Sequence, residues 1–214
     1  RHRPVRELLF VRCPRRVRRA LRWRTGSLSL SHHHVPYRPL ALLAGALLSA
    51  GAALANPNGA QVVAGTVSLS GSVPNTLDIH QGTEKAVINW SSFSIASGET
   101  VNFVQPTVNS VTLNRVLGND PSAIFGRLNA NGTVMLVNPN GIVFGPTARV
   151  DVGGLVATTA NIRDDDFLAG RWQFGEASAK PQARIVNQGE ITIKNAGLAA
   201  LVAPSVQNSG VIQA

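Results

Sequence analysis

Short apolar runs separated by asparagine and glycine fill the sequence from Asn56 onward. Several runs alternate: Val67 and Leu69 fall on one side of TVSLS, and Ile191 and Ile193 fall on one side of EITIK. Such alternation is typical of strands with one buried face, while asparagine and glycine are typical of the turns between strands. We therefore predict an all-β domain of many short strands with almost no helix.

A repeat near the end of the chain predicts how these strands are arranged. The segments that start at Val186 and Val206 each place Asn, one residue, Gly, one residue and Ile in that order. Asn187 and Asn208 are therefore 21 residues apart. A period of about 20 residues indicates stacked coils, as in a parallel β-helix. A β-sandwich would also use short strands and turns, but it gives no reason for the period.

The aromatic residues of this region are predicted to fill the core and to cover the open end of the first coil. An uncovered first coil would expose its strand edges to other chains. The less periodic strands up to about Phe103 are the natural cap. The aromatic residues are Trp90, Phe93, Phe103, Phe125, Phe144, Phe167, Trp172 and Phe174.

Charge changes the interpretation only for the beginning of the chain. The formal net charge of +9 by itself favours nucleic acid or an anionic membrane as a partner. Residues 1–55, however, contain eleven arginines and one acidic residue, so the nine basic and ten acidic residues that remain nearly cancel. Nucleic-acid binding loses its support once this leader is set aside, and we expect no nucleic-acid partner.

Residues 1–55 are interpreted as an arginine-rich extension followed by a signal peptide. The uncharged run from Leu40 ends in the letters ALA, an A-x-A cleavage pattern, so we expect cleavage after Ala55. The run is short for a membrane span, which needs about 20 apolar residues. Residues 1–37 are either an extended signal region or the result of a start site placed too far upstream.

The sequence offers no set of residues for catalysis or metal binding. The only cysteine is Cys13 in the leader, and His80 is the only histidine after the leader, which removes the usual nucleophile and base pairs. The run Asp164–Asp166 supplies three carboxylates that could help to hold Ca²⁺, but it lacks EF-hand spacing and is predicted to lie in a solvated loop. We therefore predict no catalytic residues, no cofactor and no metal site.

Three longer stretches carry a resemblance to a known family. They read AVINWSSFSIASGETVNFVQP, VTLNRVLGNDPSAIFGRLNANGTVMLVNPNGIVFGPTARVDVGGLVATTANI and DFLAGRWQF. They closely resemble the amino-terminal secretion domain, also called the haemagglutination activity domain, of two-partner secretion (TPS) exoproteins. These are the filamentous haemagglutinin-like proteins of Gram-negative bacteria. The resemblance covers residues 56–214 and is nearest to the branch of high-molecular-weight adhesins.

The resemblance implies a fold, a route and a function. The fold is a right-handed parallel β-helix with an N-terminal β cap. The route is export to the periplasm by the general secretory machinery, recognition there by the POTRA domains of a partner outer-membrane β-barrel transporter, and passage to the cell surface. The implied function is to target a large exoprotein for secretion and to nucleate its folding. Adhesion or toxicity, and any host or surface ligand, would belong to a downstream region.

The family's secretion motif falls on Asn138, Pro139, Asn140 and Gly141. These four letters are also typical of a type I turn, with proline at position i+1 and glycine at i+3. A second motif of the family, NPNL, is absent from this sequence. Asn114 and Arg115 are candidates for a second recognition segment, by resemblance to the adhesin branch. The same letters NPNG at residues 56–59 are interpreted as a coincidence.

A self-sufficient β-helix that binds or cleaves polysaccharide is the alternative function. Parallel β-helices include pectin-cleaving enzymes, yet the acidic residues of this chain show no spacing that predicts a converging carboxylate pair. The chain stops at Ala214 in the middle of a repeat, without the polar capping unit that solenoids carry at an exposed end. We therefore expect the domain of residues 56–214 to be truncated at its C-terminal end.

Overall fold

The computed structural model describes residues 56–194 and 197–214. The expected signal peptide and the cleavage site after Ala55 lie outside these residues. The described part consists of seventeen strands and one short helix. That helix is neither long enough nor apolar enough to cross a membrane. The prediction of an all-β domain with almost no helix is confirmed.

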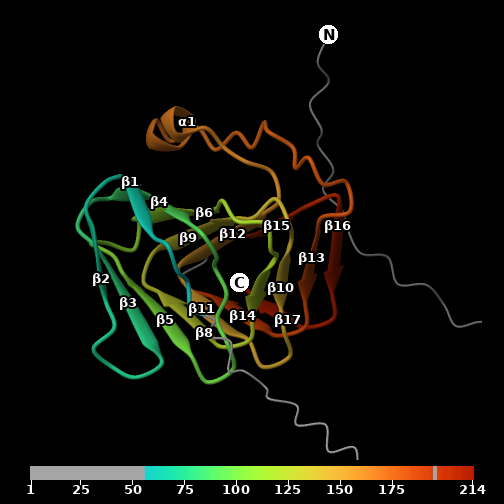
Figure 1. The fold of residues 1–214 in the computed structure, drawn as a ribbon, viewed down its shortest axis with the longest axis horizontal. Helices are drawn as coiled ribbons and strands as arrows, with labels where there is room; N and C mark the ends of the chain where they lie inside the picture. Colours follow the sequence, from blue (N-terminus) through green and yellow to red (C-terminus); the bar gives the residue numbers. More distant parts are fainter. Residues whose placement is uncertain (1–55, 195–196) are drawn as a thin grey trace, which may run out of the picture. The chain divides into compact units, whose positions relative to one another are not determined.

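The strands form three sheets that surround a common core (Figure 1). Sheet I has the order β1 (Gln61–Ala64), β4 (Lys85–Trp90), β6 (Val111–Val116), β9 (Thr133–Val137), β12 (Gly154–Thr158) and β15 (Ala199–Val202). Sheet II has the order β16 (Ser205–Asn208), β13 (Arg184–Asn187), β10 (Ile142–Phe144) and β7 (Ser122–Ile124). Sheet III has the order β17 (Val211–Gln213), β14 (Glu190–Ile193), β11 (Arg149–Val152), β8 (Arg127–Ala130), β5 (Thr100–Val104), β3 (Thr76–Gln81) and β2 (Val67–Ser70).

From β5 onward the chain visits sheet III, sheet I and sheet II in turn, so that each circuit forms one coil. Each strand pairs in parallel with its equivalent one coil away, as in the pairs β8 with β11 and β9 with β12. This arrangement is a parallel β-helix, and the fold predicted from the sequence is confirmed.

The length of a coil follows from the residues that pair across it. Arg127 pairs with Arg149, 22 positions later, and Glu190 pairs with Val211, 21 positions later. Both steps agree with the predicted period of about 20 residues. Arg149, however, pairs with Glu190, 41 positions later. This longer coil contains residues 159–183, which leave the β-helix between β12 and β13 and are called the insertion below.

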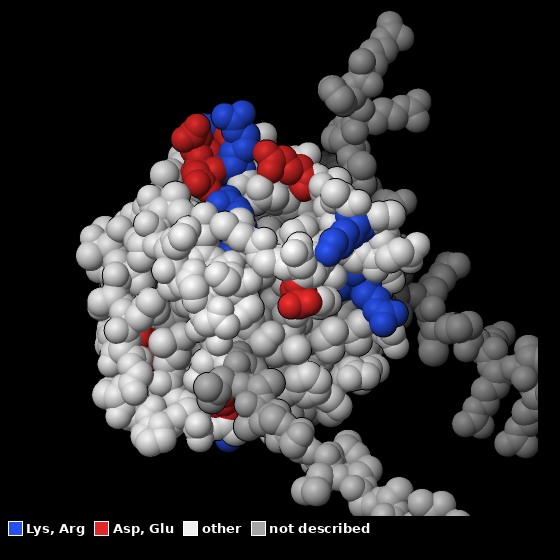
Figure 2. All heavy atoms as spheres, viewed as in Figure 1, with Lys and Arg blue, Asp and Glu red and all other residues white. Residues whose placement is uncertain are grey.

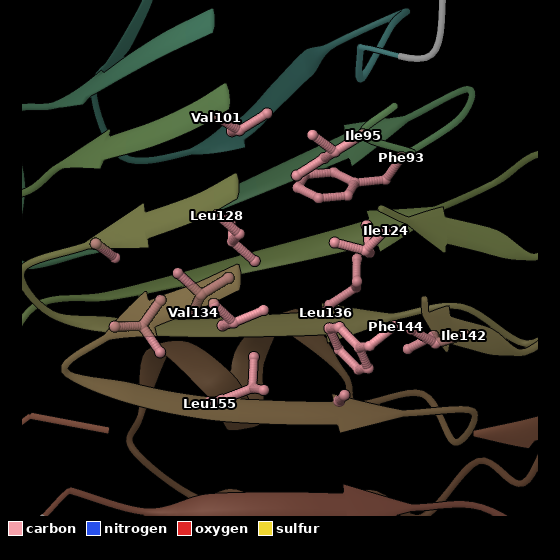
Figure 3. Close-up of a cluster of buried hydrophobic side chains, with 14 of the residues drawn as sticks. Phe93, Ile95, Val101, Ile124, Leu128, Val134, Leu136, Ile142, Phe144 and Leu155 are labelled. Atoms are coloured by element: carbon pink, nitrogen blue, oxygen red, sulfur yellow. The ribbon is translucent and has the colours of Figure 1, made fainter. Parts of the chain in front are cut away.

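The inward-facing side chains form columns that run through successive coils (Figure 3). In sheet III, Val101 lies in register with Leu128, which is followed by Val150, Ile191 and Ile212. The first four of these residues are buried in one continuous core. Full burial of an aliphatic side chain contributes about 1.5–3 kcal/mol, so these columns are the main source of stability. Ile191 and Ile193 both lie in this core, as the alternation in EITIK predicts.

The N-terminal cap consists of two antiparallel strands. Strand β1 pairs antiparallel with β4, and β2 pairs antiparallel with β3. Parallel pairing begins at Thr76, where β3 meets β5, so the prediction that the cap extends to about Phe103 is wrong. The cap strand β2 also buries its apolar face only in part, since Leu69 is 44% exposed. A strand that covers the end of a coil has core on fewer sides than a strand within the coils.

Four of the aromatic residues lie in the solenoid core, as the sequence predicts. They are Trp90, Phe93, Phe103 and Phe144, and the rings of Trp90 and Phe93 meet edge to face with centroids 5.5 Å apart. Phe167 is also buried, but on the outer face of sheet I. The prediction is wrong for Phe125 and Trp172, which are 38% and 42% exposed. Phe125 lies at a corner between coils and Trp172 lies in the insertion, where the solenoid core is out of reach.

The insertion carries the only helix of the described part, α1 (Asp164–Leu168), on the outer side of sheet I (Figure 1). The prediction of a solvated loop over Asp164–Asp166 is wrong, because these residues form the first turn of α1 and Phe167 is fully buried. Acidic residues stabilise the first turn of a helix. Figure 2 shows charged side chains of both signs gathered around this helix, while much of the same face carries no charge.

Candidate functional site

The motif Asn138–Gly141 forms the corner between β9 of sheet I and β10 of sheet II. The Gly141 N–H donates to the Asn138 carbonyl at 3.1 Å, which closes a four-residue turn. Asn140 has a negative φ, which excludes a type II turn, and Gly141 has a φ of 114°. The turn predicted from the sequence is confirmed.

The side chain of Asn138 holds this corner together from inside. Its Nδ2 donates to the Asp120 carbonyl and to Ser122 Oγ, both at 3.0 Å, and so reaches the corner of the preceding coil. Its Oδ1 accepts bonds of 2.9 Å from the backbone N–H and from Nδ2 of Asn140. Asn138 is 0% exposed. A buried amide with all these partners fixes the conformation of the turn.

Asn140 and Pro139 connect the motif to its surroundings. Asn140 Nδ2 donates to the Gly118 carbonyl at 2.8 Å in the preceding coil. Asn140 Oδ1 accepts a hydrogen bond from Lys180 Nζ, and the Pro139 carbonyl accepts one of 2.6 Å from Ser178 Oγ. Ser178 and Lys180 both belong to the insertion. The motif is therefore held between the preceding coil and a segment that comes about 40 residues later.

The motif offers little of itself to a partner in the folded domain. Asn138 and Gly141 are buried, and Pro139 and Asn140 are half-buried. A Cβ on Gly141 would lie 2.8 Å from the Arg184 carbonyl, so the next coil also packs closely against the turn. The hydrogen-bonding atoms of the motif point mainly into the protein. Access to them requires some part of the surrounding structure to move.

Asn114 and Arg115, the candidates for a second segment, point to opposite sides of β6. Asn114 faces inward in a column between Ile88 and Leu136 and is 0% exposed. Its Oδ1 accepts a 3.0 Å hydrogen bond from the indole Nε1 of Trp90. The structure thus places Asn114 in the core, where it satisfies a buried indole.

Arg115 faces outward and holds the start of the insertion. Its guanidinium donates to Asn161 Oδ1 at 2.8 Å, to the Ile162 carbonyl at 2.8 Å and to Asp164 Oδ1 at 2.6 Å. It also donates to Asn89 Oδ1 at 3.2 Å, on the neighbouring strand β4. The Arg115 side chain is 12% exposed. A planar, multivalent donor is well suited to bind several acceptors at once.

The insertion is the part of the site that the sequence pattern did not predict. Arg115 binds its beginning, and the motif at 138–141 binds its end, so one segment contacts both candidate regions. Between these anchors, Ile162 and Phe167 pack on an apolar column on the outer face of sheet I, which consists of Val87, Leu113, Met135 and Val156. The signal in the sequence was the nearly continuous apolar run in strands such as TVMLV of β9, which places apolar side chains on both faces of the sheet.

The acidic residues and the histidine of the described part are not gathered into a metal-binding group. Residues 56–194 and 197–214 contain no group of three or more His, Cys, Asp or Glu that could hold a metal ion. The carboxylates of Asp164 and Asp166 form ion pairs with Arg115 and Arg171 instead of converging. His80 is exposed on β3.

Comparison with known proteins identifies the family. Residues 53–214 match the family described as TPS secretion domain. The chain belongs to this family. Exoproteins that carry a TPS domain are secreted or associated with the cell surface, and they depend on a partner transporter of the two-partner system. Membership favours a non-enzymatic role for the domain.

Relatives of this TPS domain come from Haemophilus influenzae. A heme/hemopexin-binding protein is 39% identical over 118 residues, or 55% of this chain and 13% of that protein. A second heme/hemopexin-binding protein, from strain KW20, is 43% identical over 106 residues, or 50% of this chain and 12% of that protein. The chain thus spans about an eighth of the length of these relatives.

A solved structure supports the assignment of the fold. The HMW1 secretion domain from Haemophilus influenzae matches with a TM-score of 0.69 and 37% sequence identity, over 73% of this chain and 42% of that one. The similarity to the high-molecular-weight adhesin branch expected from the sequence is thereby confirmed.

Proposed function

We propose that this TPS domain directs its exoprotein to a partner outer-membrane transporter, and that the transporter's POTRA domains read the turn at Asn138–Gly141 in the periplasm. Family membership supports the secretion role. The observation that carries the assignment to the turn is its set of contacts: each side-chain amide in it is used, and both Asn138 and Asn140 bond to the preceding coil. A turn so strongly specified has a defined shape for a partner to recognise.

The proposed route begins with the leader. Residues 1–55 would carry the chain to the general secretory machinery and would be removed after Ala55. Residues 56–214 would then form the secretion domain, which nucleates folding of the sequence that follows it outside the cell. We place the effector activity, and any host or surface ligand, in such a following region, because the curated relatives share only about an eighth of their length with this chain.

Recognition of the turn is proposed to precede completion of the fold. Asn138 and Gly141 are buried in the finished domain, and the insertion binds the Pro139 carbonyl and Asn140 Oδ1. Asn140 is the residue we assign to partner contact, because it is half-buried whereas Asn138 is 0% exposed. Asn138 is assigned a positioning role, because its Oδ1 fixes both nitrogens of Asn140.

Secretion through the transporter tests this proposal. Asn138→Ala and Asn140→Ala are each expected to lower the extracellular yield of the exoprotein when it is co-expressed with its transporter. Gly175→Ala is the control, because its new Cβ would meet nothing within 4 Å. An extracellular yield that is unchanged in both asparagine variants would contradict the assignment of the motif.

Arg115 and Asn114 are assigned different parts in the same process. Arg115 is proposed to contribute by holding the start of the insertion and is a recognition candidate only when the insertion is displaced. Asn114 is proposed to act through the stability of the core, because none of its surface is exposed. Variants at Asn114 should therefore lose secretion only as far as they lose stability.

A further inference from the structure

The insertion covers the secretion motif from a later part of the chain. Ser178 donates to the carbonyl of Pro139, which lies 39 residues earlier, and Lys180 donates to Asn140 Oδ1, 40 residues earlier. Lys180 Nζ also reaches the Asn119 carbonyl at 3.3 Å, in the preceding coil. The Pro139 carbonyl and Asn140 Oδ1 therefore gain these partners only after residues 178–180 have folded against the motif.

The insertion also covers an apolar surface that the β-helix does not otherwise need. Val87, Leu113, Met135 and Val156 form one column across four strands of sheet I, on the face opposite the solenoid core. Each of these side chains is at most 2% exposed, because Ile162 and Phe167 lie on them. The outward column of sheet III is polar by contrast: Asp78 bonds to Asn102, and Asn102 bonds to Asn129. The apolar outer face of sheet I is thus suited to pack against another segment, here the insertion.

The order of the chain fixes the order in which these contacts can form. Strands β4, β6, β9 and the turn at 138–141 all precede the insertion. A chain that emerges from its N-terminus presents the motif and the apolar column before it presents the residues that cover them. The insertion also makes few polar contacts to the sheet between its two anchors, apart from the bond of Lys85 Nζ to the Leu168 carbonyl at 2.6 Å.

We propose that residues 159–183 act as a clasp that masks the secretion motif. In the open form, Pro139, Asn140 and Arg115 are available to the transporter. In the closed form, Ser178 binds the Pro139 carbonyl, Lys180 binds Asn140, and Asp164 binds Arg115. Phe167 then covers the apolar column. This proposal rests on the function proposed above and makes the binding one-way. The domain binds the transporter while the clasp is open, and it is released without rebinding once the clasp has closed.

The first test opens the clasp without touching the motif. Phe167→Ala removes its apolar anchor, and Ser178→Ala combined with Lys180→Ala removes its polar anchor; Gln182→Ala, exposed on the same segment, is the control. Both opened forms are expected to bind more of a hydrophobic dye and to exchange amide hydrogens faster over 159–183, while strands β8 to β11 keep their protection. The control should behave as the wild type. Unchanged dye binding and exchange in both opened forms would overturn the proposal.

The second test measures binding of the folded domain to the purified POTRA region of the transporter. A domain that is only rarely open binds with an affinity reduced by its open fraction. The opened variants should therefore bind at least about tenfold more tightly than the wild type. Asn140→Ala should abolish this gain. Urea-unfolded wild-type chain, diluted into the assay, serves as a reference in which the motif is unmasked.

The outcomes separate the clasp from the proposed function. If the unfolded chain binds and the opened variants bind no better than the closed wild type, masking is wrong and the secretion role stands. If neither the unfolded chain nor the opened variants bind, recognition of the motif is wrong, and masking falls with it. Where Phe167→Ala does not fold, trypsin can nick the wild-type insertion after the exposed Arg171. The nicked domain should bind like the opened variants, and binding at the wild-type level would overturn the clasp.

Discussion

The indole nitrogen of Trp90 donates a 3.0 Å hydrogen bond to the side-chain oxygen of Asn114 inside the β-helix. Trp90 is 1% exposed and Asn114 is 0% exposed, so water can serve neither group. The amide nitrogen of Asn114 donates in turn to the carbonyls of Thr112 and Met135, at 3.4 and 3.3 Å. One asparagine side chain thus bonds to an indole N–H and to the backbone carbonyls of two neighbouring strands within an otherwise apolar column.

Asn114→Ala is expected to destabilise the folded domain. The substitution leaves the Trp90 N–H buried without an acceptor, which costs about 1–3 kcal/mol. Urea denaturation of the purified domain measures this loss. In the background of Trp90→Phe the same substitution should cost less, because the donor is already gone, and equal losses in both backgrounds would show that the hydrogen bond carries no energy.

Asn138→Ala and Ser122→Ala separate the shape of the turn from its recognition. Asn138→Ala removes the four side-chain bonds of Asn138 and is expected to cost about 1–3 kcal/mol and to reduce secretion. Ser122→Ala removes one partner of Asn138 Nδ2 and leaves the motif itself intact. It is expected to cost about 0.5–1.5 kcal/mol with secretion near the wild-type level. Denaturant unfolding and extracellular yield should be measured on the same variants. A yield that falls in proportion to stability in both would mean that the motif acts only through the fold.

Three glycine variants separate backbone strain from crowding. Gly141 has a φ of 114° and a Cβ there would lie 2.8 Å from the Arg184 carbonyl; Gly98 has a φ of 88° with nothing within 4 Å. Gly141→Ala should cost more stability than Gly98→Ala, and each should cost more than about 1 kcal/mol. Gly175→Ala has neither problem and should stay within about 1 kcal/mol of the wild type. Thermal unfolding of the three variants checks this order. Equal losses of stability in Gly141→Ala and Gly98→Ala would show that the next coil moves away from the new Cβ of residue 141 at no cost in free energy.

The contact between Arg115 and Asp164 is expected to couple sheet I to the insertion. A double-mutant cycle with Arg115→Met and Asp164→Asn should give an interaction energy of about 0.5–3 kcal/mol, because the pair lies at 2.6 Å and Arg115 is mostly buried. Arg115→Lys should recover little of it, since a single ammonium cannot replace a guanidinium that binds four acceptors. Denaturant unfolding gives the energies. Additive losses, or full recovery by lysine, would contradict this role of Arg115.

The sequence predicted best those features that depend on stacking. The repeat that contains Asn187 and Asn208 predicted coils in register, and Asn187 Nδ2 donates to Asn208 Oδ1 at 2.9 Å. Each residue of a solenoid faces its equivalent in the next coil, so a period in the sequence translates directly into contacts. The turn at Asn138 was predicted for a similar reason, since proline and glycine restrict the local backbone whatever surrounds it.

The pattern of apolar and polar residues did not predict contacts between segments that are distant in the sequence. Asp164–Asp166 suggested a solvated loop because charge dominates the local sequence, and only Arg115, 49 residues earlier, explains why the first turn of a helix lies against the protein there. Phe167 was expected in the core, yet it is buried on the outer face of sheet I, which a list of apolar positions does not distinguish from the inner face. The N-terminal copy of NPNG does not form a corner like the one at 138–141. Asn58 forms an antiparallel bridge with Ser92 instead.

The coil that contains the insertion is nearly twice as long as its neighbour, since Arg149 and Glu190 lie 41 positions apart where Arg127 and Arg149 lie 22 apart. The entropy of closing a flexible loop grows only with the logarithm of its length, so this doubling costs about 0.6 kcal/mol. Burying the ring of one phenylalanine contributes about 1.5–3 kcal/mol. A corner of a β-helix can therefore gain or lose a segment of this size with little effect on the pairing of the strands beside it.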